Sequence, residues 1–420
     1  MERLLHYVWK YKLYSTELIT TEGQKISVID TGLHNMDAGP DFFNAKIKDG
    51  DTIWAGDVEI HDRASDWFRH GHDKDKAYDS VILHIVEEDD AVVHRTNGER
   101  IPQLILSIPD AVRNNIEYLL NNELRLPCLP VIQEADPFLI SSWLGALTCE
   151  RMERKRTDID NLLERYNNDW NEAFYITLTR NFGFGLNSDA FEQLACSLPM
   201  SYIHKQRHSI SQVESLLFGQ AGLLEESENC EYYRLLQREY KFLSHKFGLT
   251  PLELSRFKSL RTRPVNFPHI KLAQLSALWF KYDTLFSNLL HANTINELRH
   301  YLRVSPSDYW ETHYHFKNAS AFKKKELGDN ALNILIINTV VPMMFAYGHK
   351  TDQLEYCERA IRILEHLQPE QNNITQMFSQ SGIRIANASE SQAVIQLKRE
   401  YCEKKKCMYC RIGFLYLKRK

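Results

Sequence analysis

The chain of 420 residues is 43% hydrophobic and 25% charged, a balance typical of a soluble globular protein with two or three domains. Its formal net charge of −4 at pH 7 excludes the globally basic character of many nucleic-acid-binding proteins. The charge is unevenly distributed, because residues 1–110 hold 12 Lys and Arg against 21 Asp and Glu, whereas residues 391–420 hold 9 against 2. This asymmetry predicts different roles for an acidic N-terminal part and a basic tail.

The sequence carries no clear signal for secretion or for a membrane. The first residues lack the apolar segment of a signal peptide. The longest apolar run, residues 332–347, contains Asn333, Asn338 and Pro342, so we interpret it as a buried helix and not as a membrane span. Eight cysteines without a signal peptide predict a reducing compartment. We therefore expect a cytoplasmic protein with no membrane partner.

Residues 1–127 predict a mixed α/β domain. Apolar residues recur at helical spacing in residues 2–14, and Asp49-Gly50-Asp51 predicts a turn between two strands. Residues 65–78 are expected to be partly helical, and residues 110–124 to form a helix. Period-two alternation and β-branched residues predict strands at residues 25–29, 42–47, 52–61, 80–86 and 101–108.

Prolines mark the end of this domain, at Pro127, Pro130 and Pro137. Beyond them we expect a helical domain over residues 128–390, without a fixed-period repeat, and then a basic, cysteine-containing segment over residues 391–420. The predicted fold class is therefore α+β, a mixed α/β domain followed by a mostly helical one. The predicted helices are residues 138–156, 157–182, 189–197, 209–224, 230–247, 269–289, 294–303, 328–347 and 353–367.

One motif in the N-terminal domain points to chemistry. Asp41 follows the turn Gly39-Pro40 at the start of a predicted strand, and Glu59-Ile60-His61 lies on the next strand. The period of two places Asp57, Glu59 and His61 on one face of that strand. If the two strands pair, Asp41 and Glu59 converge on one point, where their oxygens suit Mg²⁺ or Mn²⁺. Such an ion would activate water and stabilise charge on a phosphate.

This arrangement resembles the PD-(D/E)XK nuclease superfamily, in which a helix precedes a strand bearing Pro-Asp and a strand bearing acid-x-Lys, followed by a further helix and strand. By position, Pro40-Asp41 matches the first element and Glu59-Ile60-His61 the second. Glu2, on the preceding helix, matches the helical acid of many members. His61 replaces the lysine, and a neutral imidazole carries no permanent charge. The resemblance implies a restriction-endonuclease-like domain with Asp41, Glu59 and His61 as catalytic residues.

A second set of candidate ligands follows in a polar loop. His70 and His72, together with His61, would suit zinc or iron, since imidazole is the commonest transition-metal ligand. The alternative interpretation is that the loop histidines are solvated or hydrogen-bonded. His84 alternates with apolar residues, which favours a buried position in the sheet. The residues expected to be accessory to the site are Glu2, Asp57, His70 and His72.

Cysteines gather near the end of the chain at Cys402, Cys407 and Cys410, among several lysines. The Cys-x₂-Cys pair suits one tetrahedral zinc ion, and the spacing also matches the first three ligands of a plant-type iron–sulfur cluster. The sequence identifies no fourth ligand, and a reduced trio that packs the last helix is the alternative. Basic residues within 151–156 and within 256–271 suit phosphate, although solvated helix faces explain them more simply.

The combined motifs resemble one bacterial family, the domain of unknown function 2851. The resemblance covers nearly the whole chain but brings no established activity. We expect a metal-dependent nuclease or a nuclease-like nucleic-acid-binding protein, with DNA or RNA as its partner. The alternatives are a non-catalytic module that binds nucleic acid or protein, and a His-rich metalloenzyme centred on His61, His70 and His72. The segments that carry the resemblance are residues 38–42, 56–61, 65–67, 70–72 and 391–392, with Cys402, Cys407 and Cys410.

Overall fold

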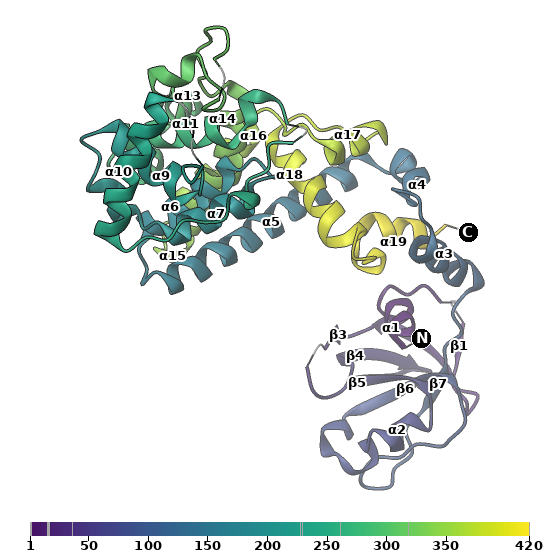
Figure 1. Ribbon diagram of the computed structural model, residues 1–420. Coiled ribbons are helices and arrows are strands. Elements are labelled where there is room, and N and C mark those ends of the chain that lie inside the picture. Colours follow the sequence, from purple (N-terminus) through teal and green to yellow (C-terminus); the bar gives the residue numbers. More distant parts are fainter. Residues whose placement is uncertain are drawn as a thin grey trace. The chain divides into compact units, whose positions relative to one another are not determined.

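The computed structural model describes residues 2–14, 17–35, 37–226, 228, 230–260, 262–317 and 319–419. The chain forms two compact units, and each is described by itself (Figure 1). Unit 1 comprises Met1–Ile140 together with Arg399–Lys420, and unit 2 comprises Ser141–Lys398. The end of the chain therefore belongs to the N-terminal unit, whereas the sequence predicted a separate segment over residues 391–420.

Unit 1 is built around one sheet of seven strands. The strands are β1 (Leu18–Ile19), β2 (Lys25–Asp30), β3 (Leu33–His34), β4 (Phe42–Asp49), β5 (Thr52–Arg63), β6 (Val81–Glu88) and β7 (Gln103–Ile105). The helical elements are α1 (Glu2–Lys10), α2 (Asp66–Arg69), η1 (His72–Lys74), η2 (Lys76–Tyr78), α3 (Asp110–Asn121), α4 (Leu129–Glu134), η8 (Cys407–Tyr409) and α19 (Arg411–Leu417).

The strand order is β1-β2-β4-β5-β6-β7, and β3 pairs with β4 outside this path. Strands β2, β4 and β5 form an antiparallel meander, with Gly50 at φ +56 in the turn between β4 and β5. After α2, strand β6 returns parallel to β5, and β7 lies parallel to β6. The sequence predicted the five longer strands and this turn. It missed β1 and β3, because strands of two residues are too short to show a period.

Helices cover both faces of this sheet. On one face, Leu5 and Val8 of α1 form a buried core with Val58 and Ile60 of β5, joined by residues of α3 and α19. On the other face, Trp67 of α2 lies in a smaller buried cluster with residues of β6 and the following loop. Figure 1 shows α1 and α2 on opposite sides of the sheet. Because side chains alternate along a strand, Glu59, which lies between Val58 and Ile60, faces the α2 side.

Two bulges interrupt the pairing of β5 on either side of Asp57. On β4, Phe43 and Asn44 fall between the pairs Phe42–Val58 and Ala45–Gly56, and Asn44 has φ +55. On β6, one extra residue lies between the partners of Asp57 and Val58. A Cβ atom on Gly56 would lie 2.4 Å from Cγ2 of Ile82, so the strands approach closely here. Bulges bend a strand and re-aim its side chains, and these two lie directly before Glu59.

Residues of the tail complete the helical layer of unit 1. The ring of Tyr416 stacks on that of Tyr118 with 5.6 Å between centroids, and Nδ2 of Asn115 donates to the carbonyl of Tyr416 (3.2 Å). The Nζ of Lys405 donates to the carbonyl of Leu120 (2.8 Å). These contacts with α3 explain why the tail and the sheet form one compact unit.

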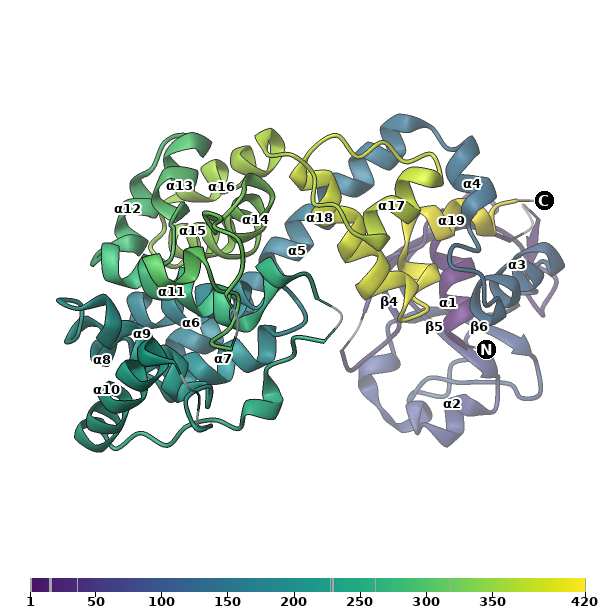
Figure 2. The same ribbon diagram turned by 45° about the horizontal axis from the view of Figure 1, so that its top comes forward.

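The regular secondary structure of unit 2, within its described residues, is helical apart from one isolated β-bridge between His313 and Ala319, and Figure 2 shows its helices from a second side. The helix α5 begins before the boundary of the unit, and η7 ends after it. The elements are α5 (Pro137–Arg165), α6 (Trp170–Phe182), α7 (Ser188–Ser197), α8 (Met200–His204), α9 (Ile210–Gln220), α10 (Glu231–Phe247), η3 (Leu254–Arg256), η4 (Pro264–Asn266), α11 (Pro268–Lys281), α12 (Leu285–His291), α13 (Ile295–Leu302), η5 (Asp308–Glu311), α14 (Asp329–Leu335), η6 (Ile336–Val340), α15 (Val341–Lys350), α16 (Leu354–His366), α17 (Asn373–Gln380), α18 (Ala388–Gln396) and η7 (Leu397–Cys402).

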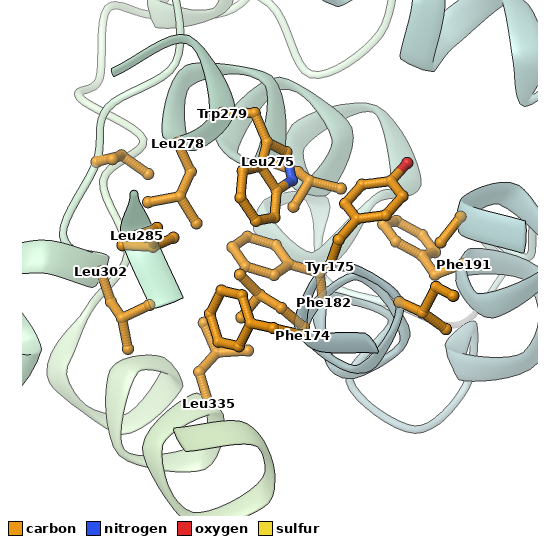
Figure 3. Close-up of a cluster of buried hydrophobic side chains, with 14 of the residues drawn as sticks. Phe174, Tyr175, Phe182, Phe191, Leu275, Leu278, Trp279, Leu285, Leu302 and Leu335 are labelled. Atoms are coloured by element: carbon orange, nitrogen blue, oxygen red, sulfur yellow. The ribbon is translucent and has the colours of Figure 1, made fainter. Parts of the chain in front are cut away.

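A large apolar core holds these helices together. Figure 3 shows aromatic residues of α6, among them Phe174, Tyr175 and Phe182, beside Trp279 of α11. The ring centroids of Tyr175 and Trp279 lie 5.5 Å apart in an edge-to-face arrangement, which aromatic pairs prefer.

Two predicted helix limits in unit 2 were wrong. The break expected after residue 156 lies instead between α5 and α6, where Asn167 and Asn168 have positive φ. Asp169 then begins α6, because its side chain accepts N–H bonds from Asn171 and Glu172. The single helix expected over residues 269–289 is divided into α11 and α12, since extended backbone at Tyr282 ends α11.

One helical segment is long and apolar enough to cross a membrane by length and composition alone. It comprises residues Asp329–Lys350, and 72% of its apolar window is buried inside the protein. This burial agrees with the sequence interpretation of the same run as a core helix. The cytoplasmic location remains a prediction.

Candidate metal centre

Asp41 and Glu59 hold each other in place where β4 begins. The pairing of Phe42 with Val58 brings them together from adjacent strands. The backbone N–H of Asp41 donates to Oε2 of Glu59 (3.0 Å), and the N–H of Ile60 donates to Oδ2 of Asp41 (2.9 Å). The turn before Asp41 contains Gly39 at φ +103, a conformation that L residues rarely adopt. Each carboxylate thus binds a backbone N–H on the other strand, which holds the two side chains at neighbouring positions.

His61 faces Glu59 from the same side of β5. Its ring is 2% exposed, and its Nε2 lies 3.5 Å from Oε1 of Glu59. Its Nδ1 lies 2.9 Å from Nε2 of His84, which is fully buried on β6. Burial and the neighbouring imidazoles lower the pKa of His61 to about 2, and burial lowers the pKa of His84 to about 3. Both rings are therefore neutral near pH 7, and each keeps one nitrogen with a lone pair.

The segment after α2 brings two more imidazoles to the same place. Gly71, at φ +77, lies between His70 and His72. Nδ1 of His70 lies 3.2 Å from Nε2 of His61, and Nε2 of His72 lies 3.3 Å from Oε1 of Glu59. One ligand atom from each of these three histidines lies within 4.8 Å of the other two. His72 is buried and stacks on Tyr78 with 3.7 Å between centroids, so it is not a solvated loop residue.

His6 extends the cluster from α1. Its Nε2 lies 3.3 Å from Oδ2 of Asp41 and 3.9 Å from Oε1 of Glu2, which is one turn earlier. Burial acts to lower the pKa of His6, but the Asp41 carboxylate outweighs it, and the pKa is raised. His6 was not among the residues predicted for the site. The available signal was a histidine four residues after Glu2, on the helix that precedes the Pro-Asp strand.

Asp57, expected to be accessory to the site, binds the backbone of the sheet. Its Oδ1 accepts the N–H of Asn44 (3.0 Å), and its Oδ2 accepts the hydroxyl of Ser80 (2.6 Å). Its own N–H donates to the carbonyl of Ser80 (3.0 Å). Asp57 therefore joins the bulged positions of β4 to the start of β6, and both of its carboxylate oxygens are engaged there.

The donors at the centre of the cluster suit a transition metal ion. We call Glu59, His61, His70 and His72 the His–Glu cluster; imidazole nitrogen favours zinc, iron or nickel, whereas Mg²⁺ prefers oxygen alone. The buried Nε2 of His72 faces Oε1 of Glu59 at 3.3 Å, and a cation placed between the two atoms would be bound by both. Burial also raises the pKa of Glu59, and a cation would counter this effect by stabilising the carboxylate.

The three tail cysteines do not form a comparable group. Within the described residues, which include Cys402, Cys407 and Cys410, the His61, His70 and His72 set alone gathers three ligand atoms within 4.8 Å. All eight cysteines are described, and none forms a disulfide. Cys407 packs against the apolar core of unit 1, and burial raises the pKa of its thiol. This environment agrees with the alternative of a reduced trio beside the last helix.

These features define a protein with a mixed α/β unit that presents a carboxylate and histidine cluster, and with a second, helical unit. The chain belongs to the family described as protein of unknown function (DUF2851), because the family model matches residues 2–373. The family membership predicted from the motifs is thereby confirmed. The match includes every residue of the His–Glu cluster. No curated protein and no solved structure is significantly similar to the chain.

Proposed function

We propose that the protein is a metal-dependent phosphodiesterase that cleaves nucleic acid, with a transition metal ion at the His–Glu cluster. The observation that carries this proposal is the position of Oε1 of Glu59, which lies 3.3 Å from Nε2 of His72 and 3.5 Å from Nε2 of His61. One carboxylate oxygen beside the imidazole nitrogens of His61, His70 and His72 is a ligand set for such an ion.

The order of elements supports the choice of a nuclease. The PD-(D/E)XK pattern requires a helix, a strand with Pro-Asp, a strand with the second acid, and a further helix and strand. Here α1 precedes Pro40-Asp41 at the start of β4, Glu59 and His61 follow on β5, and α2 and β6 come next. The pairing of β4 with β5 and the parallel return of β6 fit this pattern. The histidine in place of lysine then serves as a metal ligand.

Each residue has a distinct part in this proposal. Glu59, His61, His70 and His72 hold the ion, and His84 fixes the ring of His61 so that Nε2 faces the cluster. When bound, the ion would lower the pKa of a water molecule and neutralise charge on a phosphate. Within the described residues, Oδ1 of Asp41 accepts no hydrogen bond. Asp41 therefore has an oxygen with which to orient the attacking water.

The test measures metal binding and cleavage separately on the full-length protein. Elemental analysis and titration with Mn²⁺, Zn²⁺, Fe²⁺ and Mg²⁺ report the ion, and labelled single- and double-stranded DNA and RNA report cleavage. We expect one equivalent of a transition metal. We also expect Glu59→Gln and Asp41→Asn to reduce cleavage by at least about a hundredfold. Glu88→Gln is the matched control, because Glu88 lies on β6 but pairs with Arg63 at the surface.

The two readouts assign each failure to one part of the proposal. If no ion binds more tightly to the wild type than to Glu59→Gln, the metal centre is wrong. If the ion binds but no nucleic acid is cleaved above the level of the Asp41→Asn/Glu59→Gln double variant, the catalytic part is wrong. The non-catalytic binding module would then be the better description.

A further inference from the structure

A buried lysine in unit 2 has no acidic partner among the residues that the structure describes. Lys271, on the first turn of α11, is 6% exposed. Its Nζ donates to Oε1 of Gln274 (3.3 Å) and lies 4.5 Å from the ring centroid of Phe184. Gln274 is itself fixed, because its Nε2 donates to the carbonyl of Lys325 (2.7 Å). Both of these partners are neutral, so no described residue in contact with the ammonium balances its charge, and an unbalanced buried charge is costly.

This lysine lines a pocket of about 470 Å³. The exposed Lys323 and Lys324 lie on its rim, with Glu326 and Asp329 as the acidic lining residues. Asp329 pairs with Arg303, which neutralises part of this acidic charge. The remaining wall is partly apolar and includes Val265, Ile270, Leu327 and Ala331. The lining thus combines basic and apolar residues, and the volume of the pocket suits a small organic anion.

Two helices begin at the same pocket. Residues on the first turn of α11 and residues Gly328–Ala331 at the start of α14 line it. The second helix continues without a break from Asp329 to Lys350. Neither helix start has a side-chain cap, so their first N–H groups remain available as donors. Helix N-termini carry partial positive charge and favour anions, in agreement with the buried lysine.

We propose that this pocket binds the phosphate group of a phosphate monoester, with Lys271 as the cation and the apolar wall beside the organic part. Lys323 and Lys324 would attract the anion, and the uncapped N–H groups would share its oxygens. The source of the phosphate is either a free nucleotide or the terminal phosphate of a nucleic acid. The pocket lies in unit 2 and uses none of the residues of the His–Glu cluster, so the inference stands independently of the proposed nuclease activity.

Titration of the full-length protein tests this site. The probes are adenosine monophosphate, adenosine and inorganic phosphate, measured by calorimetry in the presence of a chelator so that no metal ion contributes. We expect the monophosphate to bind, inorganic phosphate to bind more weakly and adenosine not to bind. Comparing oligonucleotides with a 5′-phosphate and with a 5′-hydroxyl distinguishes the two sources. Stronger binding of the phosphorylated oligonucleotide than of the mononucleotide assigns the site to a nucleic-acid end, and the reverse assigns it to a free nucleotide.

Two substitutions remove or neutralise the charge of Lys271 without emptying the pocket. Lys271→Met keeps the length of the side chain, and Gln274→Glu supplies the missing carboxylate beside Lys271. Each is expected to weaken binding of the monophosphate by about 10- to 100-fold. Lys241→Met, an exposed lysine of α10, is the matched control and leaves the affinity unchanged.

Thermal unfolding separates loss of the ligand site from loss of structure. If Lys271 served only to stabilise the fold, its replacement would lower the melting temperature. We expect Lys271→Met to raise the melting temperature instead. The inference is overturned if adenosine binds as tightly as its monophosphate, or if both pocket variants fold and keep wild-type affinity. It is overturned also if the wild-type protein binds no monophosphate at millimolar concentration.

Discussion

At the scale of single residues, His61 connects the two halves of the candidate site. Its Nε2 faces Glu59 and its Nδ1 faces His84, so the ring lies between a carboxyl group and a neutral imidazole. His84 is fully buried, and its ring packs edge-on to Trp67 with 5.3 Å between centroids. The partner of a metal-binding histidine fixes its tautomer and its orientation, and here this partner is another histidine.

Replacing His84 should therefore weaken metal binding without removing a ligand. His84→Phe keeps a ring of similar size but leaves Nδ1 of His61 without its contact. We expect the affinity for the transition metal to fall by about 10- to 100-fold, and His84→Gln, which keeps a hydrogen-bonding group, to lose less. Metal titration measures the affinity, and circular dichroism checks that each variant is folded. An affinity equal to that of the wild type in a folded His84→Phe protein would contradict the role of His84.

Lys271 predicts a dependence of stability on pH. Burial lowers the pKa of Lys271 to about 8 from its ordinary value of 10.5. Between these values the unfolded chain binds more protons than the folded chain, so the contribution of Lys271 to the free energy of unfolding becomes more favourable as pH rises. The slope is at most about 1.4 kcal/mol per pH unit.

Urea denaturation of the wild type and of Lys271→Met between pH 7 and pH 10.5 measures this contribution. Other alkaline effects cancel in the difference between the two proteins. The difference in the free energy of unfolding between the two proteins should be constant below pH 8. Above pH 8 it should shift in favour of the wild type. A difference that stays flat across the whole range would mean that Lys271 is not desolvated.

The sequence predicted part of the candidate metal centre for a simple physical reason. Period-two alternation fixes Glu59 and His61 on one face, and the neighbouring strand brings Asp41 to it. His70 and His72 were candidates by composition alone, because no local pattern says that a loop folds back over a strand. His6 escaped prediction, since the sequence of a helix does not reveal which strand end it covers.

At the scale of elements, the bulges beside Asp57 determine how β5 presents the cluster. Sequence alternation predicted β4, β5 and β6, but it predicted Asp57 as a site residue on the same face as Glu59. The extra residues on β4 and β6 leave backbone groups that the regular ladder does not pair. The carboxylate of Asp57 binds the N–H of Asn44 among them. Bulges depend on both neighbouring strands, which is why one strand read alone does not predict them.

Asp57→Ala should therefore destabilise unit 1 and leave the metal ligands in place. Two hydrogen bonds to a carboxylate are lost at a partly exposed position, which we expect to cost about 2 kcal/mol. Asp57→Asn, which keeps an acceptor for Asn44, should cost less. Chemical denaturation measures the loss of stability, and elemental analysis measures the metal. If Asp57→Ala lost its metal while keeping full stability, Asp57 would be a ligand after all.

At the scale of the whole molecule, unit 1 is assembled from both ends of the chain. Leu417 of α19 is fully buried in the same core as Leu5 of α1 and Ile116 of α3. The sequence predicted the mixed α/β domain and the helical domain from local periodicity. It did not predict this return, because contacts between segments 301 residues apart, such as that of Asn115 with Tyr416, leave no local pattern. The tail thus contributes packing to the unit that carries the candidate metal centre.

This assembly predicts that one substitution near the C-terminus weakens the N-terminal unit selectively. Leu417→Ala removes a fully buried side chain and should destabilise unit 1 by about 2–5 kcal/mol. Hydrogen exchange followed by mass spectrometry should then show faster exchange in β5, β6 and α3, with little change between residues 170 and 390. Leu364→Ala, at an equally buried position of unit 2, is the matched control and should show the opposite distribution. If both variants accelerated exchange in both units equally, the two units would unfold as one cooperative structure. Faster exchange near His61 in Leu417→Ala alone would show that the tail helps to keep the cluster in its folded geometry.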